Sequence, residues 1–535
     1  MSERSPWSRR RFLGVAAAGT AGVAAFGPLG ACSSDDGQGT ASSTTASGPI
    51  APSASSTATF PDGVMAGDPR PDGAVIWTRA DPSLAGTDVL WEVVDDDGVT
   101  IVATGSVVPD DAADGSVRVL VTGLDPDRWY DYRFVSPDDL ESPIGRLRTA
   151  PTVDSSPERL TFAWCSCQQI NDSLYVAQRA MATEPDLDFF VHLGDYVYVN
   201  DQETLEIDDY REVYHRFKAD PLLQQLQSAV PIVAMFDDGE FYNGVDATGD
   251  PARLRAAQTA WREAFPVADL DPEAPVYRSL VWGDLAELFM LDVRSYRDPA
   301  VDATDTATPE GAVALDADRT TLGPEQKAWL LDGLRESDAA WKVLGNPYNL
   351  SLTRFEDRDD GPPREPGEQV NAGNYFPNEA WDDYPAERRE LLQAIVDDGV
   401  ADVVSVSGHT HVWIAGLLQP DPDDPASPVA AFDFTCGSLT ADPNVLDVKG
   451  STPEAERPKQ LAIEEIGLQI NQHFRYLNFV DQGYGLAHVT PDEIILEFKL
   501  VDPFDEAAEA KVGARFVLPR GATDMVAETF DDARR

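Results

Sequence analysis

Basic residues, cysteine and histidine are all scarce in this chain of 535 residues. Lysine and arginine number 41 against 93 aspartates and glutamates, which gives a formal net charge of -52. A chain this acidic repels nucleic acid and anionic lipid head groups, so neither is expected as a partner. Only four cysteines are present, and Cys165 and Cys167 stand too close along the chain to pair without distorting a strand. A disulfide framework is therefore not expected.

Long apolar runs are also missing. The modest run at residues 14–29 is rich in alanine and glycine, and it is too short for a stable transmembrane helix. It follows Arg9 and Arg10, which predicts a twin-arginine export signal. The sequence Leu-Gly-Ala before Cys32 predicts a lipobox, so that a lipid on Cys32 is the expected membrane attachment. The alternative is cleavage nearby and release of a secreted protein.

The rest of the chain is too long for one core at about 100–200 residues per domain. The expected organisation is a twin-arginine signal with lipobox (1–32), a disordered Ser/Thr-rich tether (33–57), a β-sandwich domain (58–151), a catalytic domain (158–502) and a C-terminal segment that is a candidate lid (503–535). Short alternating segments separated by Asp-Gly and Pro-Asp turns predict the sandwich, which carries no catalytic cluster. We expect a monomer.

From residue 159 onward, short apolar runs alternate with amphipathic segments. Strands are expected at 160–164, 187–193 and 401–407, and a mostly helical stretch at 210–228. This alternation predicts an α/β sheet with helices on both faces. Ligand sites in such sheets lie at the carboxyl ends of the strands. A polar insertion at 356–383 is expected to be a loop near the site.

Residues with metal-binding side chains follow several of these expected strands. Cys167 follows the first strand, and Asp195 follows the second with Tyr198 three residues beyond it. His409 and His411 account for two of the six histidines, and paired imidazoles are common ligands of transition metals. The less specific alternatives are that both imidazoles only form hydrogen bonds within a loop and that Cys167 is a buried apolar residue.

Together these motifs resemble the PhoD-like alkaline phosphatases of the calcineurin-like metallophosphoesterase superfamily. The stretches that carry the resemblance are residues 60–79, 166–168, 192–198, 291–297, 322–326 and 381–385. The resemblance implies a four-layer αββα sandwich preceded by a small all-β domain of the immunoglobulin or fibronectin III type.

The resemblance also implies two metal ions. A ferric ion would be held by Cys167, Asp195, Tyr198 and His411. A second ion, calcium in the family, would be bridged by Asp195 and reached by Asp238.

Two residues depart from the family pattern. Gly239 stands where the family usually has histidine, and His409 stands where it commonly has aspartate. Because calcium prefers oxygen ligands, His409 should favour manganese, zinc or iron in the second position. Asn243 matches the family's phosphate-contacting asparagine, and Arg253 or Arg255 is a candidate for a similar contact.

These residues predict hydrolysis of a phosphate ester, either a small molecule or a cell-envelope component, by a metal-bound hydroxide. Asp238 and His409 are expected to take part in catalysis, beside Asn243 and Arg253. One alternative is a phosphodiesterase or phospholipase D that acts on envelope diesters. A second is a catalytically weak surface binding protein on the same fold. Arg294 is expected either to orient a substrate oxygen or to pair with Asp292.

Overall fold

The computed structural model describes residues 58–170, 173–199, 204–268, 274–301, 316–353, 380–424, 426–442 and 453–530. The expected export signal, lipobox and tether, and most of the polar insertion at 356–383, lie outside these ranges. Within the described ranges, no helix has both the length and the apolar character needed to cross a membrane.

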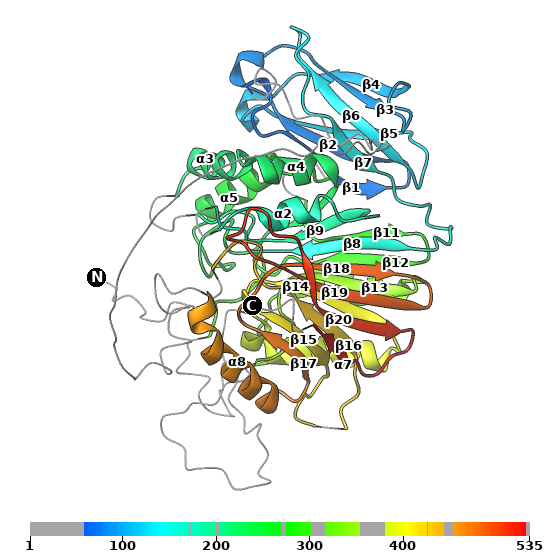
Figure 1. Ribbon diagram of the computed structural model, residues 1–535, viewed down its shortest axis with the longest axis vertical. Coiled ribbons are helices and arrows are strands. Elements are labelled where there is room, and N and C mark those ends of the chain that lie inside the picture. The colour runs from blue at the N-terminus through cyan, green and yellow to red at the C-terminus, as the bar shows by residue number, and fades with distance from the viewer. Residues whose placement is uncertain are drawn as a thin grey trace, which may run out of the picture.

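Two large sheets form the centre of the molecule (Figure 1). The ten-stranded sheet has the order β21 (Ala527–Thr529), β20 (Lys511–Pro519), β19 (Glu493–Val501), β18 (Gln482–Val489), β8 (Leu160–Cys165), β9 (Phe189–Leu193), β10 (Ile232–Met235), β1 (Val64–Arg70), β2 (Gly73–Arg79) and β5 (Ser116–Thr122). The seven-stranded sheet has the order β11 (Arg278–Trp282), β12 (Ala286–Met290), β13 (Trp341–Tyr348), β14 (Val403–Gly408), β16 (Ala431–Thr435), β15 (Trp413–Leu418) and β17 (Phe474–Asn478).

The central strands β8, β9 and β10 run parallel, as do β12, β13, β14 and β16. Every residue of β8, β9 and β10 is buried, as expected for parallel strands that are covered on both faces. Strand β9 contacts β13 and strand β8 contacts β14, so the two sheets pack face to face.

Helices cover the outer faces of both sheets. The helices are α2 (Val176–Met181), α3 (Ile207–Lys218), α4 (Pro221–Ala229) and α5 (Pro251–Ala264) beside the ten-stranded sheet, and α6 (Gly323–Glu336), α7 (Pro385–Asp397) and α8 (Pro453–Ile470) beside the seven-stranded sheet. The predicted four-layer fold is therefore confirmed. The helical stretch expected at 210–228 is two helices, because Asp220 caps the first turn of α4 and Pro221 begins it.

The N-terminal β-sandwich has a second sheet of its own, with the order β4 (Ile101–Val107), β3 (Val89–Val94), β6 (Trp129–Val135) and β7 (Gly145–Arg148). This sheet packs on β1, β2 and β5, which belong to the ten-stranded sheet. The two domains thus share a sheet through the parallel pair β1 and β10, where Gly67 lies opposite Ile232. A Cβ at Gly67 would lie 2.6 Å from the Ile232 carbonyl oxygen, so the join requires glycine.

The segment after residue 502 corrects one expectation. A candidate lid was expected at 503–535, but β20 pairs with β19 and β21 pairs with β20. The described part of this segment therefore extends the ten-stranded sheet beyond the expected boundary of the catalytic domain. Apolar residues alternate along β20, and this alternation buries one face of the strand.

Candidate metal centre

The carboxyl ends of four strands bring several candidate ligands to one place. Cys167 lies two residues after β8, Asp195 two residues after β9, and Asp237 two residues after β10. These strands are neighbours in the ten-stranded sheet. His409 directly follows β14 in the facing sheet. The site therefore lies where the two sheets meet at their carboxyl edge.

The backbone is unusual at four of these positions. Cys167, Asp195, His409 and His411 have φ angles of 60°, 53°, 71° and 56°. Residues other than glycine seldom adopt this left-handed conformation, which persists only where the surrounding structure imposes it.

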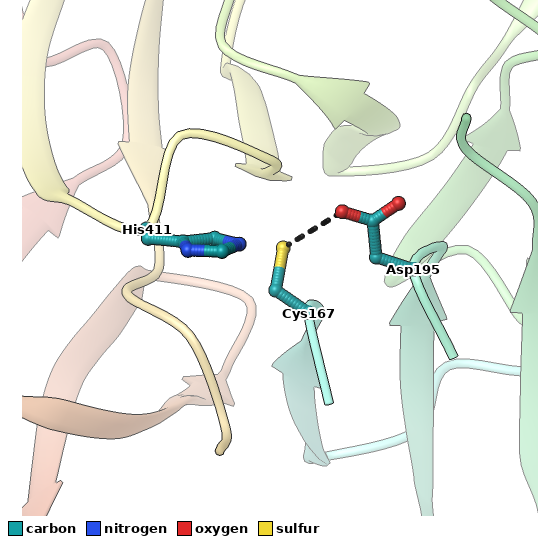
Figure 2. Close-up of side chains that lie close together, drawn as sticks. All are labelled: Cys167, Asp195 and His411. Carbon is teal, nitrogen blue, oxygen red and sulfur yellow. Dashed lines mark hydrogen bonds between the residues drawn. The ribbon is translucent and has the colours of Figure 1, made fainter. Parts of the chain in front are cut away.

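The first ligand group consists of Cys167, Asp195 and His411, whose ligand atoms lie within 4.8 Å of one another. Figure 2 shows the thiol between the other two side chains, 3.4 Å from Asp195 Oδ2. The Tyr198 hydroxyl lies 3.0 Å from Asp195 Oδ2 and 3.0 Å from His411 Nε2. His411 Nδ1 lies 2.8 Å from the Asp442 carbonyl oxygen, which accepts a hydrogen bond from the Nδ1–H group. Nε2 of the neutral ring therefore carries the lone pair.

This donor set fits a metal ion. A thiol, a carboxylate and an imidazole converge in a buried place beside the half-buried phenol of Tyr198, and three of these four groups can bind as anions. Burial raises the pKa of the Cys167 thiol, and the nearby Asp195 carboxylate raises it further. A cation among these groups would offset both effects and stabilise the thiolate.

The second ligand group consists of Asp195, Asp237, Asp238 and His409, again within 4.8 Å of one another and all buried. Asp195 thus belongs to both groups. Burial alone would raise the pKa of Asp237, but Arg294 and His409 outweigh it and lower that pKa. Carboxylates with an imidazole suit a divalent transition metal.

Glu240 holds the loops that carry these ligands. Its carboxylate accepts hydrogen bonds from the backbone N–H groups of Asp195, Tyr196 and Asp237, at 2.9, 2.7 and 2.9 Å. One side chain thereby fixes the turns after β9 and β10 against each other. Sequence analysis did not assign this role, because it depends on packing between separate loops.

Gly239 lies against the shared ligand. Its backbone N–H donates to Asp195 Oδ1 at 2.8 Å. A Cβ at this position would lie 2.6 Å from that oxygen and 2.6 Å from the Val197 carbonyl oxygen. The absence of a side chain at 239 is therefore a packing requirement of this chain.

The comparisons with known proteins agree with this geometry. Residues 162–498 match the family model described as PhoD-like phosphatase, and residues 43–151 match the model of its N-terminal domain.

The chain belongs to the PhoD-like phosphatase family.

It is thus a phosphoesterase, as predicted. Over 506 residues it is 29% identical to Alkaline phosphatase D of Bacillus subtilis (strain 168). The alignment covers 87% of this chain and 82% of that relative. A solved structure of PhoD aligns with a TM-score of 0.75 at 26% identity, covering 89% of this chain and 94% of that chain. Purple acid phosphatase PPD1 from yellow lupin (Lupinus luteus) seeds aligns with a TM-score of 0.55 at 13% identity, covering 86% and 75% of the two chains, and it supports the fold alone.

Among the residues predicted for this PhoD-like phosphatase, the six expected ligands all converge, although their binding of metal stays a prediction. Asn243 is exposed and stands beside Gly244, whose N–H donates to Asp238 Oδ2 at 2.9 Å. Arg253 donates to the Tyr210 hydroxyl at 3.2 Å and stacks on Tyr242, and no described contact joins it to the ligand groups.

The guanidinium of Arg294 does not pair with Asp292. It forms an ion pair with Asp237 instead, at 2.5 Å. Asp237 itself was overlooked as a member of the second group, although it directly precedes Asp238. Two adjacent carboxylates after a strand indicated a site without showing which contacts each of them makes.

Proposed function

We propose that this phosphatase hydrolyses phosphate esters as an alkaline phosphatase with iron and a second cation. The observation that carries the proposal is that Asp195 belongs to two adjoining ligand groups, one of them containing Cys167 and Tyr198. A carboxylate has two oxygens and can serve two cations. The substrate is a small-molecule or cell-envelope phosphate ester.

The ferric ion would be held by Cys167, Asp195, Tyr198 and His411. Asp195, Asp238 and His409 would hold the second ion, which is manganese, zinc or iron in preference to calcium because His409 supplies nitrogen. Such a pair of cations supplies an activated water as nucleophile and neutralises charge on the phosphoryl oxygens.

The chain's own residues bind and orient the ester around these ions. Exposed Asn243 donates its amide N–H to a phosphoryl oxygen. Its position follows from the turn that Asp238 closes by accepting from Gly244. Since Gly239 has no side chain to protonate the leaving group, good leaving groups are favoured. This observation keeps a phosphodiesterase activity as the second candidate.

The test compares hydrolysis of p-nitrophenyl phosphate with that of bis(p-nitrophenyl) phosphate and includes elemental analysis of the purified protein. Cys167→Ala should lose iron and activity together. Cys165→Ala is the matched control, because Cys165 is equally buried two residues earlier but belongs to neither ligand group. Preference for the diester would support the second candidate. A metal-free protein without turnover after reloading would leave only a binding role.

We also propose export by the twin-arginine route to the cell surface, with a lipid on Cys32 as membrane anchor. Replacing Arg9 and Arg10 together by lysine should retain the protein in the cytoplasm. Cys32→Ala should move the exported protein from the membrane fraction to the medium. A membrane fraction unchanged by Cys32→Ala would refute the anchor.

A further inference from the structure

A buried arginine forms one wall of the second ligand group. The side chain of Arg294 is 0% exposed. Its Nη2 lies 3.4 Å from His409 Nδ1 and 3.8 Å from Asp238 Oδ1, and its guanidinium stacks on the Tyr348 ring at 4.9 Å. Nη1 is buried and has no hydrogen-bond partner among the described residues. A permanent cation thus stands beside a place that suits a metal ion.

Both oxygens of Asp237 are already engaged within the protein. Oδ1 accepts from Arg294 Nε at 2.5 Å, and Oδ2 lies 2.6 Å from His409 Nδ1. An ionised carboxylate can only accept, so Nδ1 must carry the proton of this hydrogen bond. In the neutral imidazole the lone pair is then on Nε2, the nitrogen able to bind a metal.

Asp238, the next residue, makes different contacts. Its Oδ2 accepts from the Gly244 N–H at 2.9 Å. Its Oδ1 lies 3.8 Å from both Arg294 Nη2 and His409 Nδ1, which is beyond hydrogen-bonding distance. The two adjacent carboxylates therefore differ in their contacts with Arg294 and His409.

We propose that Asp237 is a positioning residue for His409 and not a ligand of the second cation, and that Arg294 holds Asp237 in this role. A carboxylate on the far nitrogen of a ligating histidine fixes its tautomer and orientation and strengthens it as a donor. The ion pair with Arg294 neutralises Asp237, so that Asp195 and Asp238 supply the two negative charges matching a divalent cation. The inference rests on the second cation site proposed above.

The identity of residue 409 decides whether this arrangement can form. With aspartate at position 409, Asp237 would face a carboxylate of like charge and could orient nothing. With His409, the Asp237 carboxylate accepts a hydrogen bond from the imidazole Nδ1–H and fixes the orientation of the ring. Asp237 and His409 should therefore be coupled in their effect on binding of the second cation, whereas an Asp237 that only supported the fold would not change that binding.

The test measures Mn²⁺ binding to the iron-loaded protein from the electron paramagnetic resonance signal of free Mn²⁺. Asp237→Asn should weaken Mn²⁺ binding about 10–100-fold, the usual cost of losing such a partner, and leave the iron content unchanged. Asp238→Ala should abolish saturable Mn²⁺ binding. In a His409→Asp background, Asp237→Asn should no longer weaken it.

Two results would overturn the inference. Asp237→Asn could abolish Mn²⁺ binding in both backgrounds, which would make Asp237 a ligand, or it could change nothing. Saturable binding that persists in Asp238→Ala would instead refute the second site itself. If Asp237→Asn does not fold, Arg294→Lys provides the same test, since it keeps the charge but loses the fork of donors on Asp237. It should weaken Mn²⁺ binding, and unchanged binding would count against the proposal.

Discussion

Gly239→Ala tests whether position 239 has room for a side chain. The added Cβ would stand 2.6 Å from the Val197 carbonyl oxygen and from Asp195 Oδ1, so the backbone would have to move. Overpacking of this kind costs about 1–3 kcal/mol. Movement would also weaken the hydrogen bond from the Gly239 N–H to Asp195, and hydrogen bonds to charged groups contribute about 1.5–3 kcal/mol. We expect a loss of about 1–3 kcal/mol in the free energy of unfolding and a lower iron content.

Urea unfolding gives this free energy, and elemental analysis gives the iron content. Gly467→Ala is the matched control, because its Cβ would meet only the flexible end of Leu477 and alanine favours the helix α8. Gly239→His should be more damaging than Gly239→Ala, since the whole imidazole must be placed. A Gly239→His variant with wild-type stability and higher activity on a poor leaving group would refute this reasoning.

Three further predictions follow from buried side chains. Cys167→Ala should lose iron and activity while Cys165→Ala retains both, as measured by elemental analysis and turnover of p-nitrophenyl phosphate. Burial lowers the pKa of His192 to about 3, so the wild-type protein should lose stability as the pH falls below the usual pKa of histidine. Its free energy of unfolding in urea should be roughly 2 kcal/mol lower at pH 5 than at pH 8 for this reason, and His192→Phe should remove that decrease. Burial among three aromatic rings lowers the pKa of Lys218 to about 7. The free energy of unfolding of the wild-type protein should therefore rise by roughly 2 kcal/mol between pH 7 and pH 9, and that of Lys218→Met should not show this rise. Parallel pH profiles for wild type and variant would contradict either titration argument.

Part of the alternation of strands and helices in the catalytic domain was predicted from local pattern. The strand expected at 187–193 is β9, and the strand expected at 401–407 is β14, within two residues at each boundary. Mostly apolar runs that end in polar residues have few other ways to be buried. Strand β11 was overlooked, because half-buried Arg278 and exposed Ser279 interrupt its apolar pattern at the edge of the sheet. The joining of β1 to β10 was not predictable either, because it pairs residues far apart in sequence.

The sequence by itself determined which candidate ligands follow the strands. A strand end lies at or just before each of four predicted ligands, Cys167, Asp195, Tyr198 and His411. The spacing between a strand and the residue that follows it is fixed by the amino-acid sequence. Only the tertiary structure decided which contacts the two neighbouring carboxylates make. Asp237 faces Arg294 and His409, whereas Asp238 does not accept a hydrogen bond from either. Arg294 and His409 approach from other loops, and their distances from the two carboxylates depend on how the two sheets pack against each other.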